Sequence, residues 1–169
     1  KREGDPIYLI GLTKDETGAS AYFRAKGVAG GECPKINAQV SKRTIDTLIT
    51  TIDGGMIMAC HDLSDGGLGV AAAEMVIASD GLGLTLDMRQ VPAEAKRNDI
   101  LLFSESTSRF LVEVNSRRAR DFEKLFKGLP YSKVGEVVKG KKAGLSLLDL
   151  SGSGWVLSSP EVRRAWRGY

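Results

Sequence analysis

Apolar and polar positions in the first third of the chain predict a strand, a loop and a helix in turn. Asp5–Leu12 is typical of a strand, because apolar residues recur along it between glycines. The following loop, Thr13–Pro34, is rich in glycine, and Ala19–Gly27 within it has the composition of a short helix. Asn37 is a suitable N-cap for the next helix. The apolar positions of that helix, which should pack on a sheet, are Val40, Ile45, Leu48, Ile49 and Ile52.

The middle of the chain predicts a strand that leads directly into a helix. Met56–Cys60 is a continuous apolar run, which is typical of a buried strand. Leu68–Ser79 then has a helical pattern, with Ser64 or Asp65 as the expected N-cap and Gly81 as the stop. Further strands are expected at Gly83–Met88, Arg109–Asn115, Lys133–Val138 and Leu145–Leu148, the last two joined by a polar turn at Lys139–Gly144.

Two more helices complete the pattern and lead to a prediction of the fold. Pro92 opens a helical piece that includes Ile100–Phe103, and Arg117–Phe126 is amphipathic. Interleaved strands and helices, with some adjacent strands close enough to be antiparallel, predict an α+β fold in which a mixed β-sheet is layered with α-helices as an α/β/α sandwich. We expect one domain over residues 1–169, made of an entry strand and glycine-rich loop (1–35), the sheet with its helices (36–150) and a C-terminal appendage (151–169).

Composition narrows the class of protein. Hydrophobic residues make up 42% and charged residues 27% of the 169, as in an ordinary globular domain. The formal net charge of +3 is too small to indicate binding to nucleic acid. Neither a signal peptide nor a membrane-spanning apolar run is present, which favours the cytoplasm and argues against a membrane partner. Cys33 and Cys60 have no zinc or redox spacing, and the absence of an initiating Met suggests a piece of a longer polypeptide.

The most informative segment is His61–Met75, which reads HDLSDGGLGVAAAEM. Asp62 and Asp65 lie three residues apart across the expected strand-to-helix turn, so both could ligate one magnesium ion beside phosphate oxygens. Ser64 could donate a hydroxyl to a phosphate, and Gly66 and Gly67 would let it approach the backbone. The alternative is purely structural: the polar residues cap the helix and the glycines let it pack.

Three other groups have both a functional and a structural interpretation. His61 is the only histidine, and we expect it to support the turn rather than to catalyse. Glu74 lies in an apolar helix and needs a partner, for which Arg109 is a candidate. Glu105 and Ser106, in the polar break between an apolar helix and an apolar strand, could face a ligand or could simply form a turn.

Taken in order, these motifs resemble one family. GDPIYLIGLTKDETGASAYF, CHDLSDGGLGVAAAEM, GLGLTLD and LLFSESTSRFLVEV are similar to the C-terminal domain of phosphoribosylformylglycinamidine synthase, in the AIR synthase-related superfamily. The resemblance runs from about Gly4 to about Val138. It implies an ATP- and magnesium-dependent ligase of purine biosynthesis that converts formylglycinamide ribonucleotide and glutamine-derived ammonia to the amidine. The implied partners are the remaining domains of the synthase chain and a glutaminase subunit or domain.

The same resemblance assigns roles to single residues. Asp62, with Asp65 as a weaker candidate, would ligate magnesium, and Ser64, Gly66 and Gly67 would contact an auxiliary ATP or ADP that is not turned over. Glu105 and Ser106 match a segment that binds the ribonucleotide in the catalytic half of the family, but Thr107 stands where that segment has Gln. No catalytic residue is expected in this chain, and the isolated domain should be inactive.

Two alternatives remain open from the sequence. The chain could be the equivalent domain of a hydrogenase-maturation or selenophosphate synthetase relative, although GDPIYLIGLT together with GASAYF argues against the former. It could also be a scaffold without catalytic function, in which HDLSDGG is only a turn.

Overall fold

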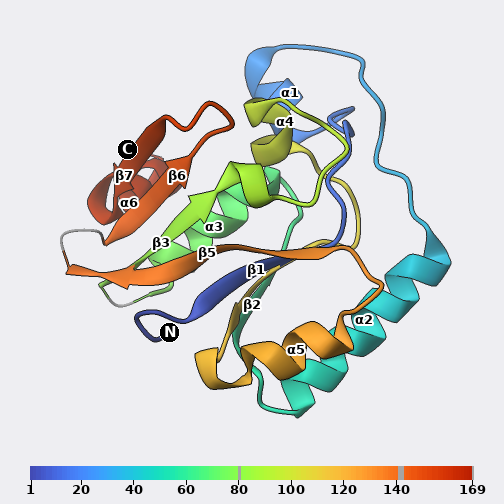
Figure 1. Ribbon diagram of the computed structural model, residues 1–169. Coiled ribbons are helices and arrows are strands. Elements are labelled where there is room, and N and C mark those ends of the chain that lie inside the picture. The colour runs from blue at the N-terminus through green and yellow to red at the C-terminus, as the bar shows by residue number, and fades with distance from the viewer. Residues whose placement is uncertain (80, 141–142, 169) are drawn as a thin grey trace.

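A computed structural model describes residues 1–79, 81–140 and 143–168 of the chain. Its centre is a seven-stranded mixed sheet in the order β2-β4-β1-β5-β3-β6-β7 (Figure 1). Neighbouring strands are antiparallel except for β3 and β6, which are parallel. The strands are β1 (Pro6–Ile10), β2 (Ile57–Asp62), β3 (Leu82–Asp87), β4 (Phe110–Val114), β5 (Tyr131–Lys139), β6 (Gly144–Leu148) and β7 (Gly154–Ser158).

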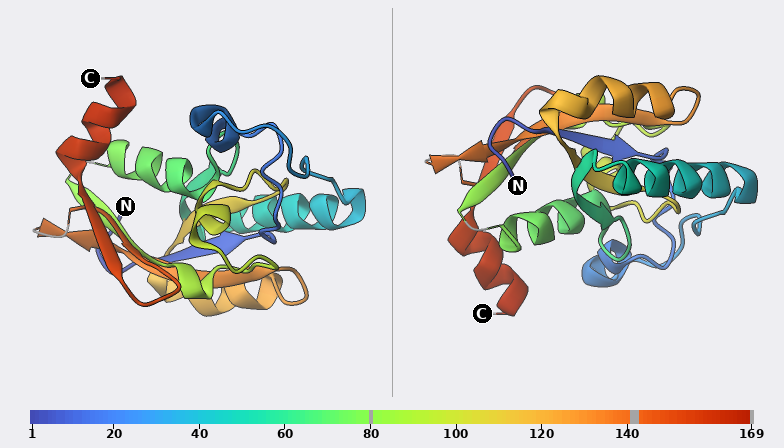
Figure 2. Two further views of the ribbon diagram at one scale, coloured as in Figure 1. Left: turned by 90° about the horizontal axis from the view of Figure 1, so that it is seen from above. Right: turned by 90° about the horizontal axis from the view of Figure 1, so that it is seen from below.

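Helices cover both faces of this sheet. They are α1 (Ala21–Lys26), α2 (Ala38–Asp53), α3 (Gly67–Ile77), α4 (Asn98–Phe103), α5 (Ala119–Leu125) and α6 (Ser159–Arg167). Figure 2 shows α3 and α5 on opposite sides of the sheet, and Figure 1 shows α2 beside α5. The predicted α+β sandwich with a mixed sheet is therefore confirmed.

Alternation along the central strands divides the interior into two apolar clusters. Ile7 and Leu9 of β1 face the cluster that contains α3, α4 and Val162 of α6. Tyr8 and Ile10 of the same strand face the other cluster, in which Leu48 of α2 lies with aromatic residues of the α5 region. Successive side chains of a strand point to opposite faces, so one short apolar strand holds both layers together.

The predicted packing of α2 was wrong in its detail. Asn37 caps the helix as expected, since its side chain accepts a hydrogen bond from the Val40 N–H at 3.1 Å. Leu48 is the only member of the expected apolar set that is buried. The other buried positions of the helix are instead Ser41, Thr44 and Thr51. The remaining apolar side chains, which are exposed, are Val40, Ile45, Ile49 and Ile52.

One strand prediction needs correction, and the sheet separates two other predicted strands. Met56–Cys60 was expected to be a buried strand, but β2 is an edge strand in which Met58 and Cys60 are exposed. β5 and β6 are both present as predicted, and β3 lies between them and pairs with both. The predicted turn at Lys139–Gly144 includes residues 141–142, which lie outside the described residues. An apolar run cannot distinguish an edge from a centre, since that depends on which strands arrive on either side.

The ends of two other elements differ from expectation. The helical piece predicted from Pro92 begins only at Asn98, as α4. The segment predicted as a C-terminal appendage supplies β7 and α6, and Val162 of α6 belongs to the larger apolar cluster. In the part of the chain that the structure describes, no helix is long and apolar enough to span a membrane.

Candidate functional site

The turn Asp62–Gly67 connects the end of edge strand β2 to the start of α3. Gly66 and Gly67 both have positive φ, +80° and +61°, which favours glycine at these positions. A Cβ on Gly67 would lie 2.8 Å from the Leu102 carbonyl oxygen, so this glycine also permits a close approach of backbone to backbone. The N-cap is Gly66, and no side chain caps the helix. The predicted capping by Ser64 or Asp65 was therefore wrong.

Asp62 and Ser64 lie together on the outside of this turn. The Ser64 hydroxyl donates a hydrogen bond to Asp62 Oδ2, and this bond lowers the pKa of the Asp62 carboxyl. The Asp62 side chain is 63% exposed, and Asp65 is exposed as well. A solvent-accessible carboxylate that stays ionised is a suitable ligand for a divalent cation.

These residues fit a shared magnesium site better than a self-contained one. Within residues 1–79, 81–140 and 143–168, no group of three or more His, Cys, Asp or Glu side chains is arranged to hold a metal. Magnesium commonly uses one or two protein carboxylates and takes its other ligands from phosphate oxygens and water. Asp62, alone or with Asp65, meets that smaller requirement. A nucleotide phosphate would have to complete the coordination.

His61 supports the turn from the other face of β2. Its Nε2 lies 2.9 Å from Glu74 Oε2 on α3, and its Nδ1 lies 2.6 Å from the Asp62 carbonyl oxygen. The predicted pairing of Glu74 with Arg109 was therefore wrong: the side chain of Glu74 reaches the neighbouring strand β2. His61 thereby ties the last residues of β2 to the middle of α3.

Glu105 holds the turn Asp62–Gly67 in place through hydrogen bonds to backbone N–H groups. Its Oε1 accepts hydrogen bonds from the backbone N–H groups of Gly66 and Ala21, both at 2.9 Å. A single carboxylate thus joins the starts of α3 and α1, where the unpaired N–H groups of a helix favour negative charge. The Ser106 side chain is buried, accepts from the Lys14 N–H at 3.1 Å and lies 3.0 Å from Ser104 Oγ. Both side chains therefore position loops around the turn.

Arg109 is the residue of this region whose role the sequence did not reveal. It is 1% exposed, and its guanidinium donates to the carbonyl oxygens of Ser106 and Ser104 and to Thr13 Oγ1. Burial lowers its pKa to about 10, so the group remains charged at neutral pH. The sequence offered one indication of this role: Arg109 follows several hydroxyl residues and directly precedes an apolar strand. That pattern does not say whether the arginine side chain is buried or exposed.

The turn borders an open hollow of about 530 Å³. Its polar lining comes mainly from Asp62, Ser64, Asp65, Glu105 and Thr107. Pro34 and Ile45 form part of its apolar wall. The structure therefore brings the metal candidates, Ser64 and Glu105 to one hollow, whereas Ser106 does not line it.

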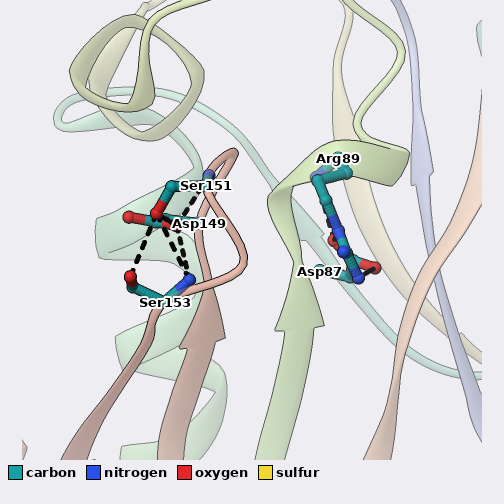
Figure 3. Close-up of polar contacts among 5 residues, drawn as sticks. All are labelled: Asp87, Arg89, Asp149, Ser151 and Ser153. Atoms are coloured by element: carbon teal, nitrogen blue, oxygen red, sulfur yellow. Dashed lines mark hydrogen bonds and ion pairs between the residues drawn. The ribbon is translucent and has the colours of Figure 1, made fainter.

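A second polar cluster lies where the parallel strands β3 and β6 end (Figure 3). Asp149 Oδ1 accepts from the N–H groups of Ser151 and Ser153 and from the Ser151 hydroxyl, at 2.7–2.9 Å. Asp87 forms a bidentate pair with Arg89, at 2.8 and 2.9 Å. In each case the contacts join residues of the same loop. We therefore assign them a structural role.

The fold and the turn at the end of β2 define the class of the protein: an AIR synthase-like α/β/α domain. Residues 2–147 match the family described as AIR synthase related protein, C-terminal domain. The chain belongs to this family.

Relatives give the same result and name the resemblance more closely. The chain is 34% identical to the phosphoribosylformylglycinamidine synthase subunit PurL of Alkaliphilus metalliredigens, over 99% of this chain and 22% of that protein. It is 38% identical to the corresponding subunit of Thermococcus gammatolerans, over 74% of this chain and 17% of that protein. The resemblance to this synthase is confirmed. The chain spans about a fifth of the length of these curated relatives.

Solved structures agree on the fold. A structure described as T. maritima PurL complexed with FGAR has a TM-score of 0.77 at 21% identity, and the match covers 90% of this chain and 26% of that one. E. coli HypE, a hydrogenase maturation protein, has a TM-score of 0.66 at 17% identity, over 95% of this chain and 50% of that one. At such identities both likenesses show the fold alone.

Proposed function

We propose that the chain acts as the C-terminal domain of a phosphoribosylformylglycinamidine synthase of purine biosynthesis. The assembled enzyme would use ATP to convert formylglycinamide ribonucleotide and glutamine-derived ammonia to the amidine. The identity to PurL subunits over nearly the whole chain supports this assignment over a hydrogenase-maturation or selenophosphate synthetase relative. Its partners would be the other domains of the synthase and a glutaminase, and its location would be the cytoplasm.

Within that enzyme, we propose that the turn Asp62–Gly67 contributes one side of an auxiliary magnesium–nucleotide site. Asp62, assisted by Asp65, would ligate magnesium, and Ser64 would contact the nucleotide. Gly66 and Gly67, both buried, would give the turn its shape, because the Gly66 N–H is engaged by Glu105 and the Gly67 N–H by the Ser64 carbonyl oxygen. The observation that carries this proposal is that the polar groups of the turn face an open hollow while Glu105 holds its backbone from inside. Bound magnesium would offset the negative charge of the phosphates.

We propose that Glu105 and Ser106 serve this site by positioning its loops. Glu105 has one carboxylate oxygen engaged by two backbone N–H groups, and Ser106 is buried. Direct contact of either residue with a ribonucleotide remains a prediction. The position of Thr107, whose hydroxyl donates to the Lys35 carbonyl oxygen at 3.2 Å, supports a structural role for this segment.

Asp62→Ala tests the metal assignment. Mn²⁺ added in trace amounts to the 169-residue chain with magnesium and ATP should broaden the amide NMR signals of residues 62–68. Asp62→Ala should remove this broadening, because a magnesium ligand is lost. Asp53→Ala, which removes an exposed carboxylate at the end of α2, is the matched control and should behave like the unaltered chain.

Two results would count against the site. Broadening that persists in Asp62→Ala, accompanied by a lower melting temperature, would favour a scaffold role for the turn. Broadening centred on other carboxylates would place the cation elsewhere.

The isolated chain should have no synthase activity. Formylglycinamide ribonucleotide, ATP, magnesium and ammonia mixed with the isolated chain should release no phosphate above background, measured by a colorimetric phosphate assay. The physical reason is that the turn supplies at most two carboxylates to a magnesium ion, and among the described residues no group of three or more His, Cys, Asp or Glu side chains could hold one. Phosphate release that depends on both the chain and the ribonucleotide would refute the composite-site proposal.

A further inference from the structure

Helix α6 separates two surfaces of different chemistry at one end of the molecule (Figure 2). On one side, Val162 and Trp166 line an apolar groove that also includes Trp155 of β7. On the other side, α6 borders an open hollow of about 490 Å³, lined by Ser159, Pro160, Arg163, Arg164 and Arg167. The match to the AIR synthase-related family ends at residue 147, before α6 begins. The hollow is therefore separate from the candidate site at the turn Asp62–Gly67.

The three arginines of this hollow share one face of α6. Arg167 lies four positions after Arg163 and three after Arg164, and residues at these spacings are neighbours on the surface of a helix. Arg163 is half-buried, and its guanidinium donates a hydrogen bond to the Ser79 carbonyl oxygen at 3.1 Å, which orients the side chain. Arg164 and Arg167 are exposed. Three guanidinium groups therefore project from about 6 Å of helix axis.

The positive charge of this face has no counterpart in the described parts of the chain. None of the three guanidinium groups has an ion pair within 4 Å there, and none of the described residues that line the hollow is acidic. Glu161 of α6 lines the apolar groove instead, and its carboxylate accepts from the Ser158 N–H at 2.8 Å and the Ser158 hydroxyl at 2.6 Å.

A purely structural role would explain only part of this cluster. Arg164 and Arg167 lie in the last turn of α6, where positive charge interacts favourably with the free carbonyl groups of a helix. Arg163 lies outside that turn. Like charges three or four positions apart on a helix also repel one another. An anionic ligand would relieve this repulsion and use all three side chains.

The lining of the hollow narrows the class of anion. Guanidinium groups bind both carboxylates and phosphates through paired hydrogen bonds. Single-stranded nucleic acid is poorly suited, because the described lining has no aromatic side chain on which a base could stack. Three arginines would also neutralise few phosphates of a duplex, whose binding depends on many such contacts. A free phosphate ion would fill little of a hollow of about 490 Å³.

The spacing of the arginines suits a polypeptide. Four residues of helix separate Arg163 from Arg167, which is a rise of about 6 Å. Alternate residues of an extended polypeptide point to the same side and lie about 6.6 Å apart. We propose that this face of α6 binds an extended acidic segment of a partner polypeptide, whose alternate carboxylates lie beside Arg163, Arg164 and Arg167.

Two fluorescently labelled synthetic peptides provide the probe. One alternates Glu with Ser, and the other alternates Lys with Ser over the same length. Fluorescence anisotropy measures their binding to the 169-residue chain at low ionic strength. The dissociation constant of the Glu peptide should be at least about tenfold lower than that of the Lys peptide, as expected for two or three exposed ion pairs. Added sodium chloride should weaken this binding, because salt screens exposed charges.

Neutralising the arginines tests the site directly. The triple variant Arg163→Gln, Arg164→Gln and Arg167→Gln should weaken binding of the Glu peptide at least about tenfold. Arg164→Glu with Arg167→Glu should reverse the preference between the two peptides. This double variant also serves if the triple variant fails to fold, because both of its side chains are exposed and the contact of Arg163 with Ser79 is retained.

The region of α5 supplies a matched control. Its exposed basic residues lie on the opposite side of the sheet from α3, and replacing three of them by Gln removes the same net charge. The control variant combines Arg117→Gln, Arg120→Gln and Lys127→Gln. Binding of the Glu peptide should change by less than about twofold, because these positions are remote from the hollow.

Several outcomes would overturn the proposal. They are equal affinity for the two peptides, no binding of either, or equal losses in the arginine and control variants. Sodium phosphate that displaces the Glu peptide where sodium chloride of the same ionic strength does not would indicate a site for small anions. Duplex DNA that binds more tightly than the Glu peptide, and loses that binding in the arginine variant, would identify nucleic acid as the ligand.

Discussion

Buried charged residues in this chain do two different things. Arg109 satisfies carbonyl oxygens that would otherwise lack donors, and it fixes the loops around the candidate site. Glu113 and Asp5 are also buried, yet Glu113 Oε2 and Asp5 Oδ2 have no hydrogen-bond partner within the described ranges. Burial is the main cause that raises the pKa of Glu113, and the nearby Asp5 carboxylate adds to it. Folding therefore disfavours the ionised form of Glu113.

Glu113→Gln should stabilise the protein at neutral pH. Because the folded state raises the pKa of Glu113 above its ordinary value of 4.5, the protonated form is favoured on folding. The stability that protonated Glu113 contributes is fully present below pH 4.5 and is lost as the pH rises through its raised pKa in the folded state. Glutamine retains the acceptor for the Arg2 N–H, so the free energy of unfolding at pH 7 should increase.

Urea unfolding at a series of pH values measures this effect. The variant should show a smaller loss of stability than the unaltered chain as the pH rises from 4.5 through the raised pKa of Glu113. Glu3→Gln, at an exposed position, is the control and should leave the dependence on pH unchanged. Equal slopes for Glu113→Gln and the unaltered chain would show that Glu113 does not titrate in this range.

Single residues divide clearly into those whose roles sequence could predict and those whose roles it could not. The sequence indicated Asn37 as a cap, because the interaction of a cap involves residues three positions apart. It could not find the partner of Glu74, because His61 lies on another element. The sequence placed Glu105 in a polar break that could face a ligand or form a turn. Its contacts with Gly66 and Ala21 could not be predicted, because they depend on where two helices begin in space.

At the scale of elements, the start of α3 is determined by close packing as much as by local conformation. Gly67 and Gly55 have nearly the same backbone angle, with φ of +61° and +65°. A Cβ at Gly55 would meet nothing within 4 Å, whereas one at Gly67 would meet the carbonyl oxygens of Leu102, in the last turn of α4, and of Ser104, which follows it. A substitution at Gly55 therefore introduces conformational strain alone, whereas the same substitution at Gly67 adds a steric conflict.

Gly67→Ala should cost about 3 kcal/mol of stability, since strain and overpacking add. Gly55→Ala should cost only about 1 kcal/mol, from the left-handed conformation. Chemical denaturation of both variants measures the difference. Equal losses would mean that the loop after α4 moves away readily, and that α3 is not held by this contact.

Element types were largely predictable, because periodicity and caps are local properties. Their packing faces and neighbours were not. The pattern of α2 suggested that isoleucines face the sheet, but the tertiary structure turns serine and threonine inward. Likewise, the apolar run of β2 lies at an edge because no strand arrives beyond it in the described sheet.

At the scale of the whole molecule, β7 and α6 are joined to the main sheet and core. β7 pairs with β6 along its length, and Val162 of α6 is 5% exposed within the larger apolar cluster. We therefore expect the C-terminal segment to unfold together with the rest of the chain. Small single domains usually unfold in a single transition.

Tryptophan fluorescence and far-ultraviolet circular dichroism should accordingly give the same denaturation midpoint. Trp155 and Trp166 report on β7 and α6, whereas circular dichroism reports on all the helices and strands. Val162→Ala should lower both midpoints together, and the free energy of unfolding should fall by about 1–2 kcal/mol. A fluorescence transition that precedes the circular dichroism transition would show that β7 and α6 form a separate, weaker unit.

The sequence by itself determined the element types, the α+β class and the family resemblance, because these depend on periodicity and on motifs of consecutive residues. Only the tertiary structure decided the strand order, the exposed faces and the partners of buried polar groups. It also decided that Asp62, Ser64 and Glu105 share one hollow and that two tryptophans frame a separate groove. Those features join residues far apart in the chain, and their geometry follows from how the layers pack.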